Sequence, residues 1–187
     1  GNLQIFNTNS SIIFSTNTSR TLPCCSGTPA GAAPFNLRLA NDVNHLWSTS
    51  ETDPSMVSVW NWRFAGPGGE SRYEPTDLTF TYSATPASTV DVVYFVTPDL
   101  TNTSAYAETS CTAPVAGNKC DRFVIRINER SLAQNLPSHM KNNLVCHELG
   151  HTVGFNDGGT TGSSCMTSGQ NSRLGWWEVA TINASYP

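Results

Sequence analysis

The chain has 187 residues with a formal net charge of −4, and its 13% of charged residues is well below the roughly 25% of typical soluble domains. It contains only two lysines and no basic run, so we expect neither nucleic acid nor a membrane surface as a partner. No apolar stretch reaches membrane-spanning length, and the length suits a single domain over residues 1–187.

The N-terminal part combines strand-like and helix-like patterns. Residues 3–15 are expected to form one or two strands, and residues 23–33 form a connector rich in Pro, Gly and Ala. Apolar residues then recur at helical spacing and predict a helix over residues 34–50: Phe35, Leu39, Val43, Leu46 and Trp47.

The middle of the chain is expected to be mostly strands. The aromatic run at residues 60–64 precedes a Gly-rich turn and is interpreted as a strand, with an aromatic sugar-binding patch as the alternative. Segments rich in β-branched and aromatic residues then predict a sheet beside the helices: residues 78–83, 91–97, 104–110 and 122–128.

A helix with metal-binding spacing is expected after Pro137, with Ser138 as its N-cap. His147 and His151 are four residues apart, so on a helix of about 100° per residue both imidazoles leave one face and can share a metal ion. Glu148 stands beside the first histidine, where its carboxylate can take a proton from a metal-activated water without being a ligand.

A third ligand is expected just beyond this helix. Gly154 can adopt the left-handed conformation that ends a helix, and Asp157 stands where the chain would turn back toward the metal. No histidine follows His151, which excludes a third imidazole from downstream. Three protein ligands and a water are typical of a catalytic zinc site. The alternative third ligand is Glu178 on a predicted final helix, the only acidic residue after Asp157.

The spacing from His147 to Asp157, followed by Met166, resembles the metzincin clan of zinc endopeptidases, and in particular its snapalysin-like members. The resemblance implies that Met166 is the Met-turn residue. It also implies an α+β catalytic domain with a twisted, mostly parallel sheet and an antiparallel edge strand. The sheet would pack on an N-terminal helix and the active-site helix, with a C-terminal helix in addition. The N-terminal subdomain would span residues 1–154 and the C-terminal subdomain residues 155–187.

The same resemblance implies a substrate site on the edge strand. In metzincin-like folds, an extended peptide pairs with this strand above the zinc. The strand in that place has small and polar side chains, which suit an edge that accepts a peptide without aggregating. The residues expected to bind substrate are Ser104, Ala105, Tyr106, Ala107 and Glu108.

Six cysteines in a chain with few lysines suggest disulfides and a secreted, extracellular protein. Cys111 and Cys120 flank a short loop, which favours a local bridge between them. Cys24 and Cys25 are adjacent and poorly placed to bond each other. The remaining cysteines are then expected to pair between distant regions: Cys24 and Cys25 with Cys146 and Cys165.

Together these patterns predict a secreted, monomeric zinc endopeptidase that acts on protein or peptide substrates. One catalytic Zn²⁺ would be held by His147, His151 and Asp157, with Glu148 as the general base. The alternative is a secreted zinc-containing binding protein, or a hydrolase of non-peptide bonds on the same fold. Calcium is common in secreted relatives, and acidic residues near predicted turns are its candidate ligands: Asp91, Asp99 and Asp121.

Overall fold

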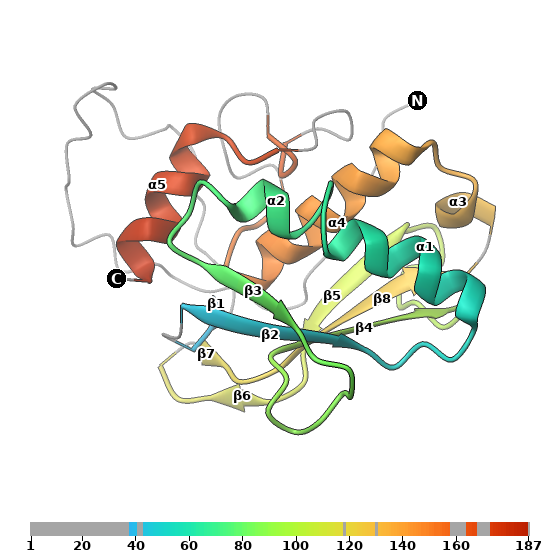
Figure 1. Cartoon of the computed structure of the whole chain (residues 1–187), viewed down its shortest axis with the longest axis horizontal. Helices are drawn as coiled ribbons and strands as arrows, with labels where there is room; N and C mark the ends of the chain where they lie inside the picture. Colours follow the sequence, from blue (N-terminus) through green and yellow to red (C-terminus); the bar gives the residue numbers. More distant parts are fainter. Residues whose placement is uncertain are drawn as a thin grey trace.

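The protein has an α+β fold, seen in a computed structural model (Figure 1). The structure describes residues 38–40, 43–117, 119–129, 131–157, 164–167 and 173–186. The expectations for residues 3–15 and 23–33, including those for Cys24 and Cys25, lie outside the described residues.

The main sheet is mixed, with strand order β3-β2-β4-β8-β5. Its first four strands run parallel to their neighbours, whereas β5 at the edge is antiparallel to β8. A parallel sheet with an antiparallel edge strand was expected, and predicted segments 78–83, 91–97 and 122–128 lie in it. The bounds are β2 Asn44–Thr49, β3 Thr79–Tyr82, β4 Val92–Thr97, β5 Ala107–Cys111 and β8 Phe123–Asn128.

A second, smaller sheet in the described part of the chain joins three short strands in the order β1-β7-β6. Their bounds are β1 Arg38–Leu39, β6 Pro114–Val115 and β7 Lys119–Cys120. The disulfide Cys111–Cys120 ties the end of β5 to β7, so the local bridge expected between these cysteines is present.

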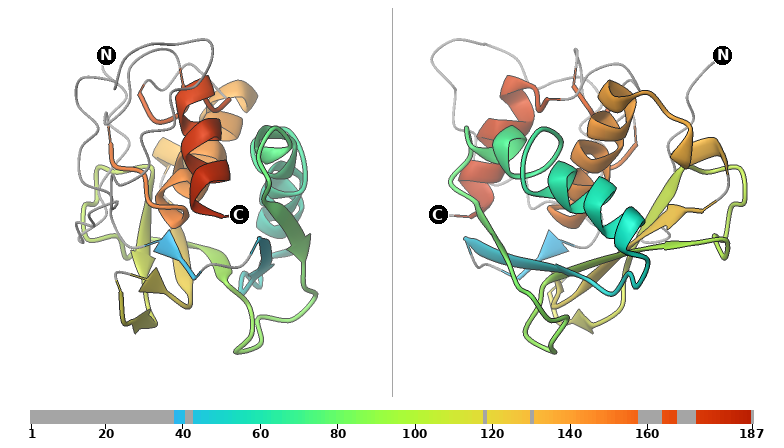
Figure 2. Two further views of the ribbon diagram at one scale, coloured as in Figure 1. Left: turned by 90° about the vertical axis from the view of Figure 1, so that its left-hand side faces the viewer. Right: turned by 45° about the vertical axis from the view of Figure 1, so that its right-hand side comes forward.

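Two longer helices, α1 and α4, lie side by side over one face of the main sheet (Figure 2). The helix bounds are α1 Pro54–Phe64, α2 Glu70–Tyr73, α3 Ser131–Gln134, α4 Ser138–Thr152 and α5 Trp176–Ser185. Among the described residues, no helix combines the length and apolar character needed to cross a membrane.

Aromatic side chains fill the space between α1 and the sheet. Phe64 on α1 stacks on Tyr94 of β4 with ring centroids 4.5 Å apart, and on Trp47 of β2 at 5.6 Å. All three side chains are buried, and such stacking adds about 0.5–1.5 kcal/mol per pair beyond the area that it buries. This cluster fixes α1 on the sheet and leaves α4 beside it.

The helix predicted over residues 34–50 is wrong for the part that the structure describes. Residues 38–39 form β1 and residues 44–49 form β2. In β2, His45 and Trp47 are both buried, which is the alternation of a strand. The ring of His45 packs edge-on against Phe80 and Tyr186, so this polar residue lies on the buried face of the strand.

The strand predicted at residues 60–64 is also wrong, because these residues end α1. Asp53 caps the helix by accepting a hydrogen bond from the Ser55 amide at 2.8 Å, and Pro54 occupies the first turn. Trp60 and Phe64, one turn apart, are both buried. The start signal Asp-Pro lies upstream of the aromatic run and predicts a helix.

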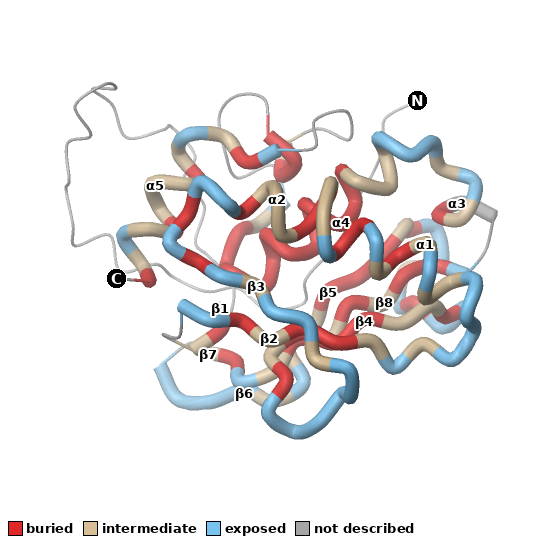
Figure 3. The backbone as a smooth tube through the Cα atoms, in the orientation of Figure 1, coloured by how far each residue is buried: buried red, intermediate tan, exposed pale blue. Residues whose placement is uncertain are grey.

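Helix α4 passes through the middle of the molecule, and its C-terminal part is enclosed by the chain (Figure 3). It begins at Ser138 as its first helical residue, with Pro137 in the N-cap position and no side-chain cap. The prediction that Ser138 is the N-cap residue was therefore wrong by one position, because Pro137 is the N-cap residue. Every residue from Asn143 to Thr152 is buried, including His147, Glu148 and His151.

Candidate functional site

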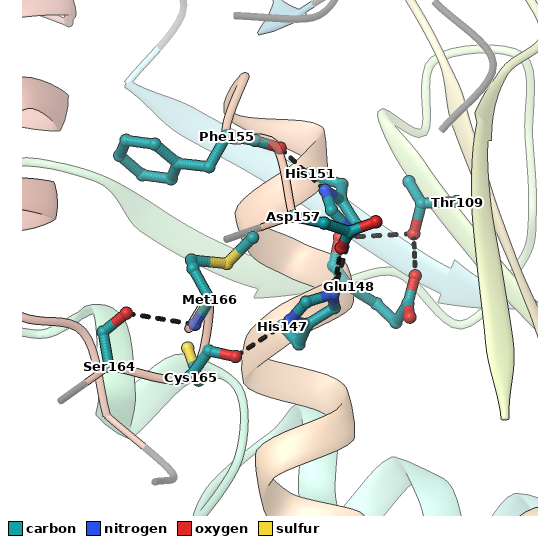
Figure 4. A network of polar contacts seen from close by, with 9 residues as sticks. All are labelled: Thr109, His147, Glu148, His151, Phe155, Asp157, Ser164, Cys165 and Met166. Atoms are coloured by element: carbon teal, nitrogen blue, oxygen red, sulfur yellow. Dashed lines mark hydrogen bonds and ion pairs between the residues drawn. The ribbon is translucent and has the colours of Figure 1, made fainter. Parts of the chain in front are cut away.

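The two histidines of α4 present their rings to one point (Figure 4). The ring centroids of His147 and His151 are 4.6 Å apart, and the Nε2 atoms are 3.0 Å apart. Both residues are buried. One turn of helix therefore brings two nitrogen donors together, as the spacing of four predicted.

The chain reverses at Gly154 and brings Asp157 to the same point. Gly154 has a φ of 105°, its amide bonds the His151 carbonyl at 3.1 Å, and the Phe155 amide bonds the Gly150 carbonyl at 3.0 Å. This pair of bonds is the Schellman motif that closes helices. The Asp157 Oδ1 atom then lies 2.9 Å from Nε2 of His147 and 3.3 Å from Nε2 of His151.

Backbone carbonyls fix the orientation of both rings. Nδ1 of His147 lies 2.8 Å from the Cys165 carbonyl, and Nδ1 of His151 lies 2.7 Å from the Phe155 carbonyl. A carbonyl only accepts, so we infer that each Nδ1 carries a hydrogen and donates it. In a neutral ring, Nε2 then has a free lone pair, which is the metal-binding form of histidine.

The donor set suits a cation. Two imidazole nitrogens and one carboxylate oxygen lie within 4.8 Å of one another, and lone pairs placed so closely repel unless a positive charge lies between them. Burial disfavours the charge on Asp157, but without a metal, protonated rings of His147 and His151 donate hydrogen bonds to it and hold the pKa of its carboxyl well below its ordinary value. Two nitrogens and an oxygen at this spacing fit Zn²⁺.

Glu148 lies beside this group and points toward β5. Its Oε2 accepts a hydrogen bond from the Thr109 hydroxyl at 2.5 Å, while Oε1 makes no hydrogen bond with the described part of the chain. Burial raises the pKa of the carboxyl above its ordinary value, against the opposing effect of His151 and His147. Glu148 is therefore a buried carboxyl whose Oε2 is held by a hydrogen bond from Thr109, whereas its Oε1 has no hydrogen bond with the described residues.

Met166 lies in the short turn 164–167 and packs under the site. A β-carbon on Gly150 of α4 would overlap the Met166 sulfur, so the two residues are in direct contact. The turn is held by the Met166 amide, which bonds the Ser164 hydroxyl at 3.1 Å, and by the Cys165 amide, which bonds the Arg173 carbonyl at 2.8 Å. The same turn supplies the Cys165 carbonyl that orients His147.

The expected pairing of Cys146 and Cys165 with Cys24 and Cys25 is wrong, because Cys146 and Cys165 bond each other. The two cysteines are 19 residues apart, and they meet because the turn 164–167 folds back against α4. This disulfide fastens the residue before His147 to the residue before Met166.

Other predicted residues lie apart from the metal group. Glu178, the alternative third ligand, is buried, and its carboxylate lies beside Gly175 at the start of α5. In the described part of the chain, neither Glu178 nor any calcium candidate (Asp91, Asp99 or Asp121) belongs to a group that could hold a metal. Asp91 instead accepts a hydrogen bond from the Leu46 amide at 2.6 Å.

The predicted substrate strand is displaced by three residues. Ser104, Ala105 and Tyr106 precede β5, which begins at Ala107 and continues to Cys111. Ala107 and Glu108 lie in the strand and are buried, and the Glu108 carboxylate accepts a hydrogen bond from the Asn102 amide at 2.6 Å.

Sequence reasoning missed the contact of Thr109 with Glu148 and the orienting carbonyls of Phe155 and Cys165. Every residue has a backbone carbonyl, so the sequence does not indicate which carbonyls will orient the histidines. Thr109 lies 39 positions before Glu148, so only the packing of β5 on α4 brings the two together.

The comparisons with known proteins agree with this geometry. Residues 70–184, more than half of the chain, match the model of the family described as dual-action HEIGH metallo-peptidase. The five letters of that description correspond to residues 147–151, with Leu149 in place of isoleucine. No curated protein matches the chain.

Proposed function

This chain belongs to the family of dual-action HEIGH metallo-peptidases and is a metzincin-type zinc metallopeptidase, and we propose that it is a secreted endopeptidase with Glu148 as its general base. One observation carries the proposal: the anchored carboxylate of Glu148 lies directly beside the converging donors of His147, His151 and Asp157. A base next to a three-ligand zinc site with room for water is the arrangement of hydrolytic zinc enzymes.

His147, His151 and Asp157 would hold one Zn²⁺, which when bound supplies Lewis acidity to the scissile carbonyl and makes a water molecule more acidic. Oε1 of Glu148 accepts the proton of that water as the C–O bond forms. It then gives the proton to the amine nitrogen as the C–N bond breaks. The raised pKa of Glu148 suits both transfers, because a carboxylate of higher pKa is a stronger base.

Backbone geometry supports peptide pairing along β5. The Asn128 amide bonds the Tyr106 carbonyl, and the Thr112 amide bonds the Arg122 carbonyl, so residues 106 and 112 face β8. In an antiparallel pair alternate residues face opposite ways, and the backbone groups of Ala107, Thr109 and Cys111 are directed away from β8. An extended substrate would pair with these groups, next to the Glu148 carboxylate.

The proposal keeps the expected organisation of the molecule. We propose an N-terminal subdomain over about residues 1–154 and a C-terminal subdomain over about residues 155–187. Two disulfides in the described part of the chain fit an oxidising compartment, and we propose that the enzyme acts as an extracellular monomer.

The test is casein cleavage by the zinc-loaded protein, by the same protein with a zinc chelator, and by Glu148→Gln. Glutamine keeps an oxygen for Thr109 and leaves the ligands in place, so this variant should bind zinc and fail to cleave. Cleavage that survives either change would contradict the proposal. Zinc binding without turnover of casein would favour a binding protein or a hydrolase of another bond.

A further inference from the structure

Thr109 of β5 makes a hydrogen bond to the proposed general base. Its hydroxyl lies 2.5 Å from Oε2 of Glu148 and 3.3 Å from the Glu148 carbonyl (Figure 4). The hydroxyl has one hydrogen, and the shorter distance and the negative charge both favour donation to Oε2. Thr109 is buried, so this contact is shielded from bulk water.

We propose that Thr109 is a positioning residue for catalysis: its hydroxyl holds Oε2 of Glu148 so that Oε1 is the atom that exchanges protons. The inference rests on the proposed function of Glu148. Among the described residues, the Thr109 hydroxyl is the donor to this carboxylate, and Oε1 has no hydrogen bond. Oε2 is therefore held in place, and Oε1 is the oxygen that can exchange a proton with water and substrate.

The position of the hydroxyl is fixed by the sheet. Thr109 lies opposite Ile125 in the middle of the β5–β8 pair, with Glu108 opposite Arg126 and Ser110 opposite Val124. A β-branched side chain in a strand has restricted χ1 freedom, so the hydroxyl has a defined direction. Glutamate has three rotatable bonds and costs free energy to hold in one rotamer. The hydrogen bond from the rigid strand β5 restricts the Glu148 side chain to one rotamer, which α4 alone does not do.

The hydrogen bond from Thr109 also keeps the Glu148 carboxylate from becoming a zinc ligand. Glu148 adjoins His147 in the chain, and a free carboxylate beside a zinc site is itself a zinc ligand. A hydrogen bond from β5 draws the carboxylate toward the strand. Thr109 therefore keeps Glu148 as a base and preserves the position that water takes.

Thr109 also belongs to the proposed substrate strand, but through different atoms. Its backbone groups are directed away from β8, whereas its side chain points to α4. Removing the hydroxyl should leave the backbone, and hence substrate binding, intact. The expected effect therefore falls on kcat and leaves KM unchanged.

The experiment compares wild type with Thr109→Val, Thr109→Ala and Thr109→Ser in cleavage of one peptide, with zinc content and melting temperature measured for each protein. We expect Thr109→Val and Thr109→Ala to keep one zinc per chain and a KM within about twofold of wild type. Their kcat should be lower by about 10- to 100-fold, as for other residues that orient metal-site groups. Thr109→Ser should recover most of kcat because it restores the hydroxyl.

Thr97→Val is the matched control. Thr97 is a buried threonine in β4, and its hydroxyl accepts a hydrogen bond from the Asp99 amide at 3.1 Å, away from Glu148. This variant should keep wild-type kcat.

Wild-type kcat in both Thr109→Val and Thr109→Ala would overturn the inference, as would a Thr109→Ser variant no faster than they are. Loss of zinc from the Val and Ala variants would also overturn it, because Thr109 would then support the metal group. If zinc-loaded wild type itself cleaves no peptide, the proposed function fails. An active wild type with unaffected Thr109 variants refutes only the role of Thr109.

Discussion

Met166 lies against Gly150 so closely that any β-carbon at Gly150 would overlap the methionine sulfur. Gly150 is in the turn of α4 between His147 and His151, so the turn 164–167 supports the segment that carries both histidines. A side chain at Gly150 would therefore force the Met166 side chain to move, and no positive φ is involved.

Gly150→Ala should destabilise the protein. Helix propensity alone would stabilise α4 by about 1 kcal/mol, but overpacking against Met166 costs about 1–3 kcal/mol. The free energy of unfolding in urea measures the balance. The cost should shrink or change sign in a Met166→Ala background, where the overlap is relieved. An equal cost in both backgrounds would show that this contact is not the cause.

The Cys146–Cys165 disulfide should support zinc binding. Its removal in Cys146→Ala/Cys165→Ala frees the turn that orients His147 through the Cys165 carbonyl. We expect the zinc dissociation constant to rise by about 10- to 100-fold, as when other partners of metal ligands are lost. Competition with a chromophoric chelator measures it.

The second bridge offers a matched control. Cys111→Ala/Cys120→Ala removes a disulfide between β5 and β7 that orients neither histidine. Each pair of substitutions should cost about 2–4 kcal/mol of stability, but only the first should weaken zinc binding. Equal zinc affinities in the two double variants would refute the orienting role.

Gly154→Ala should weaken zinc binding through Asp157. Gly154 has a φ of 105°, which alanine adopts at a cost of about 1–2 kcal/mol, and relief of this strain would move Asp157 away from the histidines. Gly117 provides the comparison, because it has a φ of 78° and a β-carbon added there would meet no atom of the described residues within 4 Å. Gly117→Ala should lose stability and keep its zinc affinity, as isothermal titration would show. Similar zinc affinities for both variants would contradict this account.

The metal group was predictable because it is local in the chain. His147 and His151 share a helix face at a spacing of four, and Gly154 turns the chain so that Asp157 joins them within one short segment. Such geometry depends on helix periodicity and on the conformational freedom of glycine, both of which a sequence displays.

The rest of the site depends on contacts between distant segments. Thr109 reaches Glu148 only because β5 pairs with β8 and packs on α4. The disulfide partner of Cys146 was misjudged for a similar reason, since the path of the chain after Asp157 decides which cysteine comes near. These contacts follow from tertiary packing, for which the sequence has no local signal.

The two wrong predictions of secondary structure, for residues 34–50 and 60–64, each depended on single residues. The buried ring of His45 hid the alternation of β2, because a polar histidine does not count toward the apolar pattern by which a strand is recognised. In α1 the prediction followed the aromatic run around Trp60 and did not use the N-cap residue Asp53, which marks where the helix begins.

The most direct test is to titrate the metal-free protein with Zn²⁺ and follow peptide cleavage and zinc content together. We expect activity to rise in proportion to zinc and to reach its maximum at one ion per chain, while Glu148→Gln binds the same single ion and stays inactive. Full activity without zinc, or an active Glu148→Gln variant, would contradict this expectation.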